Sequence, residues 1–160
     1  MKNQFTKLAK RITTELVLLD QIVSRCEEAL RRSKLSSDDL YLDSVALNLE
    51  NFYSGIERLL QLIATTLDGR VPRGEEWHKA LLEQMCSQVS GIRPAVLSET
   101  SKTMLDEFRR VRHVVRVIYT FTLEPKRLEE LTEKLRPTFS IVRRELEAFA
   151  GLLEQRARGG

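Results

Sequence analysis

Residues 8–30 read LAKRITTELVLLDQIVSRCEEAL, and the spacing of apolar side chains in this stretch decides the fold class. A β-strand would need strict alternation of apolar and polar residues, whereas one face of an α-helix needs steps of three and four. The steps are those of a helix, at Leu8, Ile12, Leu16, Leu19, Val23, Cys26 and Leu30. The stretch therefore predicts a long amphipathic helix over residues 3–33.

A second periodic segment follows the first after a short polar connection. Ser36 with Asp39 has the form of a capping box that starts a helix, and Gly69 supplies a stop. Residues 75–88 then predict a short helix, in which Trp77 anchors the element on the rest of the fold. The predicted core stripe of the second helix is Val45, Leu49, Phe52, Ile56, Leu59 and Ile63.

Two more long helices complete the pattern. Ser98 is a predicted N-cap, and Pro125 opens the last helix in its first turn, where a missing N–H costs nothing. Pro137 predicts a kink or break, and residues 156–160 predict a frayed tail. The predicted stripes are Met104, Phe108, Val111, Val115 and Ile118 in one helix, and Leu128, Leu131, Leu135, Ile141, Leu146, Phe149 and Leu153 in the other.

The predicted fold is all-α, an up-and-down bundle of four long helices plus one short helix, formed by residues 1–160 as a single domain. A chain of 160 residues is long enough to build a core without disulfides or metals. Only 6% of the residues are aromatic, and β-branched residues are scattered, which excludes an all-β fold. A bundle by itself does not determine a function.

The composition and the sequence motifs limit the functions that the chain can have. The formal charge is +3, so binding to nucleic acid must depend on where the charges lie. The sequence lacks a signal peptide and an 18-residue apolar run, so we expect a soluble cytoplasmic protein without a membrane partner. Cys26 and Cys86 are expected to be reduced and buried. Two cysteines and two histidines so far apart predict no metal site, and no Gly-rich phosphate loop or other cofactor motif is present, so no cofactor is expected.

One segment, residues 108–119, departs from the mixed charge of the other helices. On a helix its Arg109, Arg112, His113 and Arg116 share one arc with Tyr119, beside the predicted core stripe. Like charges four residues apart destabilise a helix, so something outside the helix should neutralise them. Acidic residues of neighbouring helices, such as Glu50 or Glu147, are one candidate, and a phosphate is the other, because guanidinium groups bind phosphate in a bidentate manner.

The histidines can likewise be interpreted as structural or as functional residues. His113 is either a structural residue beside the apolar stripe or a general base, kept neutral by the neighbouring cations. His78 on the short helix is a candidate residue of a cleft. Tyr53 and Arg58 on the second helix are interpreted as packing and as a structural ion pair, with an alternative role for Arg58 at a dimer or RNA surface.

Nearly the whole chain resembles the HepT-like branch of the HEPN superfamily, the helical partners of minimal nucleotidyltransferases in prokaryotic toxin–antitoxin pairs. The resemblance is carried by four strings: NFYSGIER at 51–58, WHKALL at 77–82, RPAV at 93–96 and RHVVR at 112–116, followed by Tyr119. It implies a homodimer with a basic cleft and a metal-independent RNase. It also implies that a partner nucleotidyltransferase attaches AMP to a tyrosine and so silences the RNase.

The family's nuclease motif is an Arg, four to six residues, a His, and a Tyr two residues beyond the His. If Arg112 is the motif Arg, then Tyr119 matches the Tyr position and Val117 stands where the His is expected. Counted from Arg109, His113 comes one residue too early. Either His113 acts from a shifted position or this branch has lost the nuclease and kept the fold.

The resemblance and the cationic segment together give the functional hypothesis. The chain is the toxin component of a toxin–antitoxin module and cleaves RNA, with tRNA as the first substrate to test. His113 is the base, and Arg109, Arg112 and Arg116 hold the scissile phosphate. The alternative is a catalytically silent subunit that binds a nucleotidyltransferase antitoxin and its nucleotide or substrate.

Two expectations complete the hypothesis. Val114 and Val117 lie off the core stripe and predict a symmetric homodimer built on this helix. Tyr119 is the candidate site of modification by the nucleotidyltransferase. Its alternative role is to border the core and donate its O–H to a neighbouring group.

Overall fold

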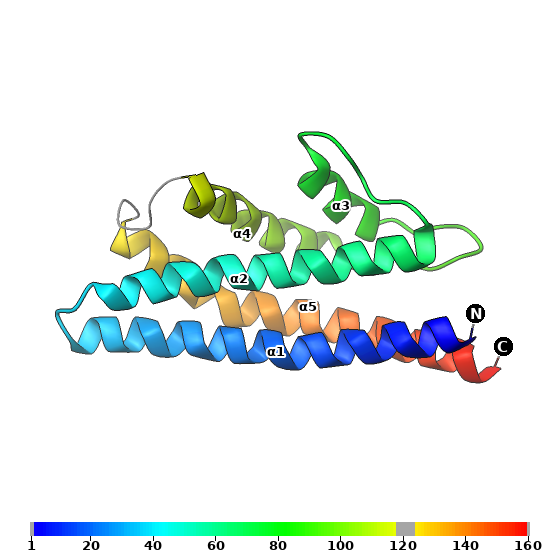
Figure 1. Cartoon of the computed structure of the whole chain (residues 1–160), viewed down its shortest axis with the longest axis horizontal. Helices are drawn as coiled ribbons and strands as arrows, with labels where there is room; N and C mark the ends of the chain where they lie inside the picture. The colour runs from blue at the N-terminus through cyan, green and yellow to red at the C-terminus, as the bar shows by residue number, and fades with distance from the viewer. Residues whose placement is uncertain (1, 118–123, 160) are drawn as a thin grey trace.

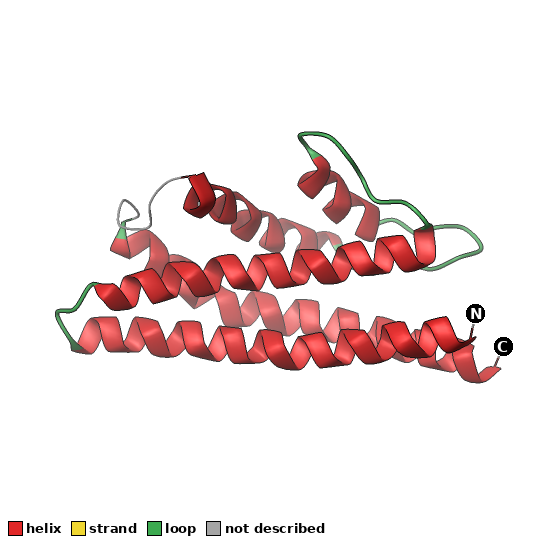
Figure 2. Ribbon diagram, in the orientation of Figure 1, coloured by secondary structure: helices red, strands yellow, loops and turns green. Residues whose placement is uncertain are grey.

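The computed structural model describes the backbone of residues 2–117 and 124–159, and the side chains of the same residues except 113–117. Within these residues the chain forms five α-helices and one π-helical turn, and no strand (Figure 2). The elements in order are α1 (Lys2–Leu35), α2 (Leu40–Ile63), η1 (Ala64–Asp68), α3 (Trp77–Met85), α4 (Glu99–Val117) and α5 (Pro125–Gly159). The predicted all-α bundle of four long helices and one short helix is confirmed.

The four long helices alternate in direction, so the bundle is up-and-down, and the described ends of the chain lie at the same end of it (Figure 1). Helix α1 packs mainly against α5 and α2, and α4 packs on α2 and α5. The short α3 lies on α2 and α4. None of the described helices combines the length and the apolar composition that crossing a lipid bilayer requires.

The predicted capping box at the start of α2 is wrong. The Ser36 hydroxyl instead donates to the Arg32 carbonyl at the end of α1, 2.9 Å away. The Asp38 carboxylate accepts the hydrogen bond of the Leu40 N–H at 2.9 Å, and Asp39 makes no side-chain cap bond. The Ser36 hydroxyl also accepts from the Asp38 N–H at 3.4 Å, but Asp38 precedes α2, so Ser36 does not cap the first turn of that helix. The predicted cap at Ser98 is confirmed, since the Ser101 N–H donates to the Ser98 hydroxyl at 3.1 Å.

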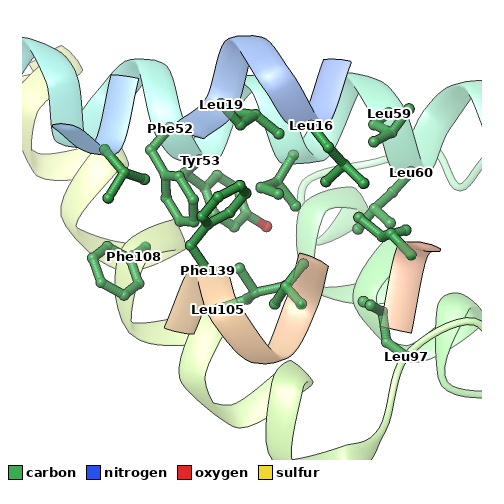
Figure 3. Packing of buried hydrophobic residues seen from close by; sticks show 14 of the residues in the cluster. Leu16, Leu19, Phe52, Tyr53, Leu59, Leu60, Leu97, Leu105, Phe108 and Phe139 are labelled. Atoms are coloured by element: carbon green, nitrogen blue, oxygen red, sulfur yellow. The ribbon is translucent and has the colours of Figure 1, made fainter. Parts of the chain in front are cut away.

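The core is centred on an aromatic group that joins α2, α4 and α5 (Figure 3). The Phe52 ring meets Phe108 at a centroid distance of 5.6 Å and Phe139 at 6.0 Å, both edge to face. Such geometry places the positive edge of one ring on the negative face of the other. This group fixes the spacing between α2 and α4, two of the three helices that carry the candidate site.

Three positions of the predicted stripes differ from the structure by one residue. Ala29 is buried where Leu30 was expected, and Leu30 is half-buried. Leu105 is fully buried where Met104 was expected, and Val142 is buried where Ile141 was expected; Met104 and Ile141 are half-buried. Both members of each pair fall within a helical turn of the next core residue, so periodicity alone admits either. Cys26 is buried as predicted, but Cys86 is only half-buried.

The last helix is longer and more regular than the sequence suggests. Helix α5 runs through Pro137 without a break and continues to Gly159. At its end the Arg156 guanidinium donates to the Ile92 carbonyl, where the sequence predicts fraying. In its middle, Arg136 holds Asp20 of α1 at 2.7 Å and Glu27 at 2.6 Å, which ties the two longest helices together beside the proline.

A buried ion pair fastens the segment around α3 to the end of η1, the turn that follows α2. The Arg93 guanidinium binds both carboxylate oxygens of Asp68 at 2.7 Å, and these side chains are 0% and 1% exposed. Its remaining N–H groups reach the backbone carbonyls of Ser87, Pro94 and Gln84. The guanidinium therefore uses all five donors. This arrangement holds α3 in the position from which His78 reaches the candidate site.

Candidate functional site

Glu57 of α2 is an acidic residue on the buried face of its helix. It follows Tyr53 by four residues and precedes Leu60 by three, so it lies in the middle of the apolar stripe, and its side chain is only 5% exposed. A carboxylate in such a place needs partners, because an isolated buried charge is very costly. Each of its two oxygens has one, and the two partners come from different helices.

Arg112 of α4 supplies the first partner. Its Nη1 donates to Glu57 Oε1 at 2.8 Å, and the Arg112 side chain is 11% exposed. The guanidinium carbon lies 5.9 Å from the centre of the Tyr53 ring, in cation–π range. The Arg112 Nε is buried and has no hydrogen-bond partner among the described residues. Arg112 is thus directed into the bundle, with part of its donor capacity unused.

His78 of α3 supplies the second partner. Its Nδ1 lies 2.5 Å from Glu57 Oε2 and 3.4 Å from Arg112 Nη1. The Trp77 ring lies beside the imidazole, with a centroid distance of 3.6 Å. The His78 side chain is 27% exposed, so it is the most accessible member of the Glu57 cluster, defined here as Glu57, His78 and Arg112.

Tyr53 forms the apolar wall of the cluster and is held in its neutral form. Burial raises the pKa of its phenol far above the ordinary value, and the nearby Glu57 carboxylate adds to that shift. Arg109 and Arg112 oppose the shift but do not reverse it. Tyr53 therefore serves as a rigid surface for the Arg112 guanidinium and offers no acid–base chemistry near neutral pH.

Two further arginines of α4, Arg109 and Arg110, are also partly neutralised. The Arg109 Nε donates to Asp106 at 2.6 Å, within the same helix, and the exposed Arg110 lies 3.5 Å from the other oxygen of Asp106. The acidic partners of Arg109 and Arg112 are thus Asp106 and Glu57. Glu147, one of the candidates from the sequence, pairs with Arg143 instead.

The predicted site residues fall into three groups. Arg109 and Arg112 are described, but they turn to different acidic partners, so they do not converge on one point. His113 and Arg116 belong to α4, and their side chains lie outside the described residues, as do those of Val114 and Val117. Tyr119 lies outside the described residues altogether.

Sequence reasoning missed Glu57 and its pairing with His78 and Arg112. The available signal was an ionisable residue within an otherwise apolar stripe, because Glu57 takes a position of the same helical face as Tyr53 and Leu60. His78 was named as a candidate cleft residue, and the structure gives it a partner 21 positions earlier in the chain.

The side chains of the candidate site are suited to binding anions and transferring protons. Among the residues that the structure describes, no group of three or more His, Cys, Asp or Glu side chains is placed to hold a metal ion. The Glu57 cluster combines a carboxylate, an imidazole and a guanidinium. The carboxylate can orient the imidazole. Both nitrogen groups can donate hydrogen bonds to an oxyanion, and the imidazole can also transfer a proton.

Comparison with known proteins adds one match. A family model described as HepT-like protein matches residues 44–153. This span begins within α2 and ends within α5, so it includes all three members of the Glu57 cluster. No curated protein and no solved structure gives a significant match to the chain.

Proposed function

The chain belongs to the HepT-like protein family, and from this we propose that it is the toxin component of a prokaryotic toxin–antitoxin module and cleaves RNA without a metal. The observation that carries the proposal is the Glu57 cluster, in which His78 and Arg112 converge on one buried carboxylate. It lies where α3 meets the helix that continues into His113 and Arg116. An imidazole and guanidinium groups are the side chains that phosphate transfer through an RNA 2′-hydroxyl requires.

In the proposed reaction the 2′-oxygen attacks the adjacent phosphorus and the bond to the 5′-oxygen of the next nucleotide breaks. His113 takes the proton of the 2′-hydroxyl. Arg109, Arg112 and Arg116 stabilise the negative charge that develops on the phosphate.

A catalytically silent binding subunit is the second candidate, and a specific observation favours it. Arg109 and Arg112 already have acidic partners within the chain, so both have part of their charge neutralised before any ligand arrives. In that case the HepT-like bundle binds a nucleotidyltransferase antitoxin and its nucleotide or substrate, and it cleaves nothing.

The proposed partners are a minimal nucleotidyltransferase, RNA such as tRNA, and a second copy of the chain. The homodimer proposal depends on Val114 and Val117, which the sequence leaves as apolar surface on α4. A protein that handles cytoplasmic RNA together with this partner would act in the cytoplasm. Sedimentation at tens of micromolar tests the dimer, and a monomer would contradict it.

Cleavage of bulk tRNA in EDTA tests the function. We expect fragments with the wild-type protein and a loss of fragments with His113→Ala and Arg112→Ala. Arg31→Ala is the matched control, because Arg31 is exposed on α1 and, among the described residues, pairs only with Glu28 of the same helix. Absence of cleavage by the wild type, combined with binding of the nucleotidyltransferase, would select the silent subunit instead.

A further inference from the structure

Cleavage through the 2′-hydroxyl needs two proton transfers, and His113 accounts for one. The 5′-oxygen that leaves must receive a proton, because an alkoxide is a poor leaving group. In the described part of the chain His78 is the only imidazole. The contact between His78 and Glu57 determines what each ring nitrogen of His78 can do.

The contact places a proton on Nδ1 of His78. An ionised carboxylate only accepts hydrogen bonds, so at 2.5 Å from Glu57 Oε2 the ring nitrogen must donate. Arg112 Nη1, which is also only a donor, is directed at the other oxygen of the same carboxylate. Glu57 therefore fixes the ring orientation, and Nε2 on the opposite side of the ring has no partner among the described residues.

The exposed fractions of the three side chains also indicate that Nε2 of His78 is free to act. Glu57 and Arg112 are 5% and 11% exposed, whereas His78 is 27% exposed. Because Nδ1 faces the buried carboxylate and Trp77 lies beside the ring, the accessible edge includes Nε2. With Glu57 negative and Arg112 positive, a protonated His78 gives the cluster a net charge of +1, which suits a phosphate.

We propose that His78 is the general acid of the reaction, donating its Nε2 proton to the departing 5′-oxygen, with Glu57 and Arg112 as its positioning residues. This inference rests on the proposed RNA cleavage. The bond between the 2′-oxygen and phosphorus forms, and the bond between phosphorus and the 5′-oxygen breaks. The products are a 2′,3′-cyclic phosphate and a 5′-hydroxyl. The base ends with one proton more and His78 with one fewer, and exchange with water restores both.

A change of leaving atom tests the assignment. The probe is an oligonucleotide that spans a mapped tRNA cleavage site, made with either oxygen or sulfur as the bridging 5′ atom. A thiolate leaves without being protonated, so the sulfur substrate does not need a general acid. General acids contribute about 10²–10⁴-fold to such reactions. We therefore expect His78→Ala to lose about 10²-fold or more on the oxygen substrate, and less than about 10-fold on the sulfur substrate.

Controls separate this result from unfolding and from failure of the proposed function. Lys79→Ala, at an exposed neighbouring position of α3, should match the wild type on both substrates. His113→Ala should be impaired on both, because the 2′-hydroxyl still needs a base. Rescue of His78→Ala by sulfur also shows that the variant is folded.

Full activity of His78→Ala on the oxygen substrate, or an equal loss on both substrates, overturns the acid assignment and leaves RNA cleavage standing. A wild-type protein inactive on both substrates overturns both proposals.

Discussion

Glu57 of α2 and Arg112 of α4 form an ion pair with a 2.8 Å hydrogen bond, and both side chains are almost fully withdrawn from water. The pair is 55 positions apart in sequence and lies beside the Tyr53 ring. Burying two charges costs several kcal/mol per ion before their attraction offsets it, so such a pair contributes little net stability. Arg112, one member of the pair, belongs to residues 108–119, which carry four arginines, so we assign the pair to the proposed function.

Substitution of one member of this pair should lower the stability of the protein strongly, whereas substitution of both should lower it little. We expect Glu57→Leu to lower the free energy of unfolding by about 3–5 kcal/mol, because the Arg112 charge stays buried without its partner. The double variant Glu57→Leu with Arg112→Met should recover most of that loss, since two apolar side chains of similar volume replace the pair. Urea unfolding of the two variants and the wild type gives both values.

Glu147→Leu is the matched control for this pair. Glu147 is half-exposed on α5 and pairs with Arg143, four residues earlier, at 2.7 Å. Exposed pairs contribute about 0–1 kcal/mol, so the control should change stability by less than about 1 kcal/mol. A double variant at 57 and 112 that is no more stable than Glu57→Leu alone would show that the penalty is not a buried unpaired charge.

The buried Asp68–Arg93 pair predicts a specific sensitivity to acid. Burial by itself would raise the pKa of Asp68, but hydrogen bonds from Arg93 and Gln84 outweigh it and hold the pKa below the ordinary value of 3.8. A carboxyl whose pKa is lowered in the folded state contributes stability above pH 3.8, and that stability is lost as the pH falls through the folded-state value.

Asp68→Asn should therefore lower the Tm at pH 6 and flatten the fall of Tm between about pH 5 and pH 2. Thermal unfolding across this range measures the effect. Asp39→Asn is the control, because Asp39 is exposed and makes no side-chain cap bond. An unchanged slope in Asp68→Asn would mean that other carboxyl groups govern the acid response.

Substitution by alanine at two helical glycines should change the stability of the protein in opposite directions. A Cβ on Gly55 of α2 would lie 2.7 Å from Cδ2 of the buried Leu19, so α1 and α2 approach closely there. A Cβ on Gly151 of α5 would meet nothing within 4 Å. Alanine favours a helix by about 1 kcal/mol over glycine, whereas overpacking costs about 1–3 kcal/mol.

We thus expect Gly55→Ala to destabilise the protein by roughly 1 kcal/mol and Gly151→Ala to stabilise it by up to about 1 kcal/mol. Equilibrium unfolding of both variants gives the two signs. If Gly55→Ala also stabilised the protein, Leu19 would have moved aside without cost, and the contact between α1 and α2 would be looser than the structure has it.

The helices could be predicted from the sequence because their signals are local. The long helix predicted from the stripe that starts at Leu8 and the helix start at Pro125 depend only on residues within a few turns, and both are confirmed. Where two adjacent apolar residues satisfy the period equally, as Met104 and Leu105 do, only the packing of α4 on its neighbours decides between them.

The candidate site could be predicted only in part, because its contacts join distant residues. Arg112 was identified from the local density of charge in its helix. Its partner Glu57 could not be, since that contact depends on how α4 lies across α2. His78 was identified as a histidine in a short helix, but its role depends on the Arg93–Asp68 pair that holds α3 in place.

The proposed regulation through Tyr119 gives a mass-spectrometric prediction. Tyr119 follows Arg112 by seven residues, the spacing of two helical turns, so a nucleotide on its phenol would bring a phosphate to the cationic segment and compete with RNA. The phenol oxygen attacks the α-phosphorus of ATP, and pyrophosphate leaves. We expect the intact mass to increase by one AMP after co-expression with the cognate nucleotidyltransferase.

Substitution of Tyr119 and Tyr41 one at a time identifies the modified residue. Tyr119→Phe should abolish the added mass, whereas Tyr41→Phe should keep it, because Tyr41 lies in the first turn of α2, away from the Glu57 cluster. Tyr53 is 1% exposed and packs in the core, so an enzyme cannot reach its phenol while the protein is folded. An unmodified mass, or an increment that survives Tyr119→Phe, would exclude this switch. Loss of the increment in Tyr119→Phe, together with restored cleavage of tRNA, would place the phosphate of the modification and the phosphate of RNA in competition for the same arginines.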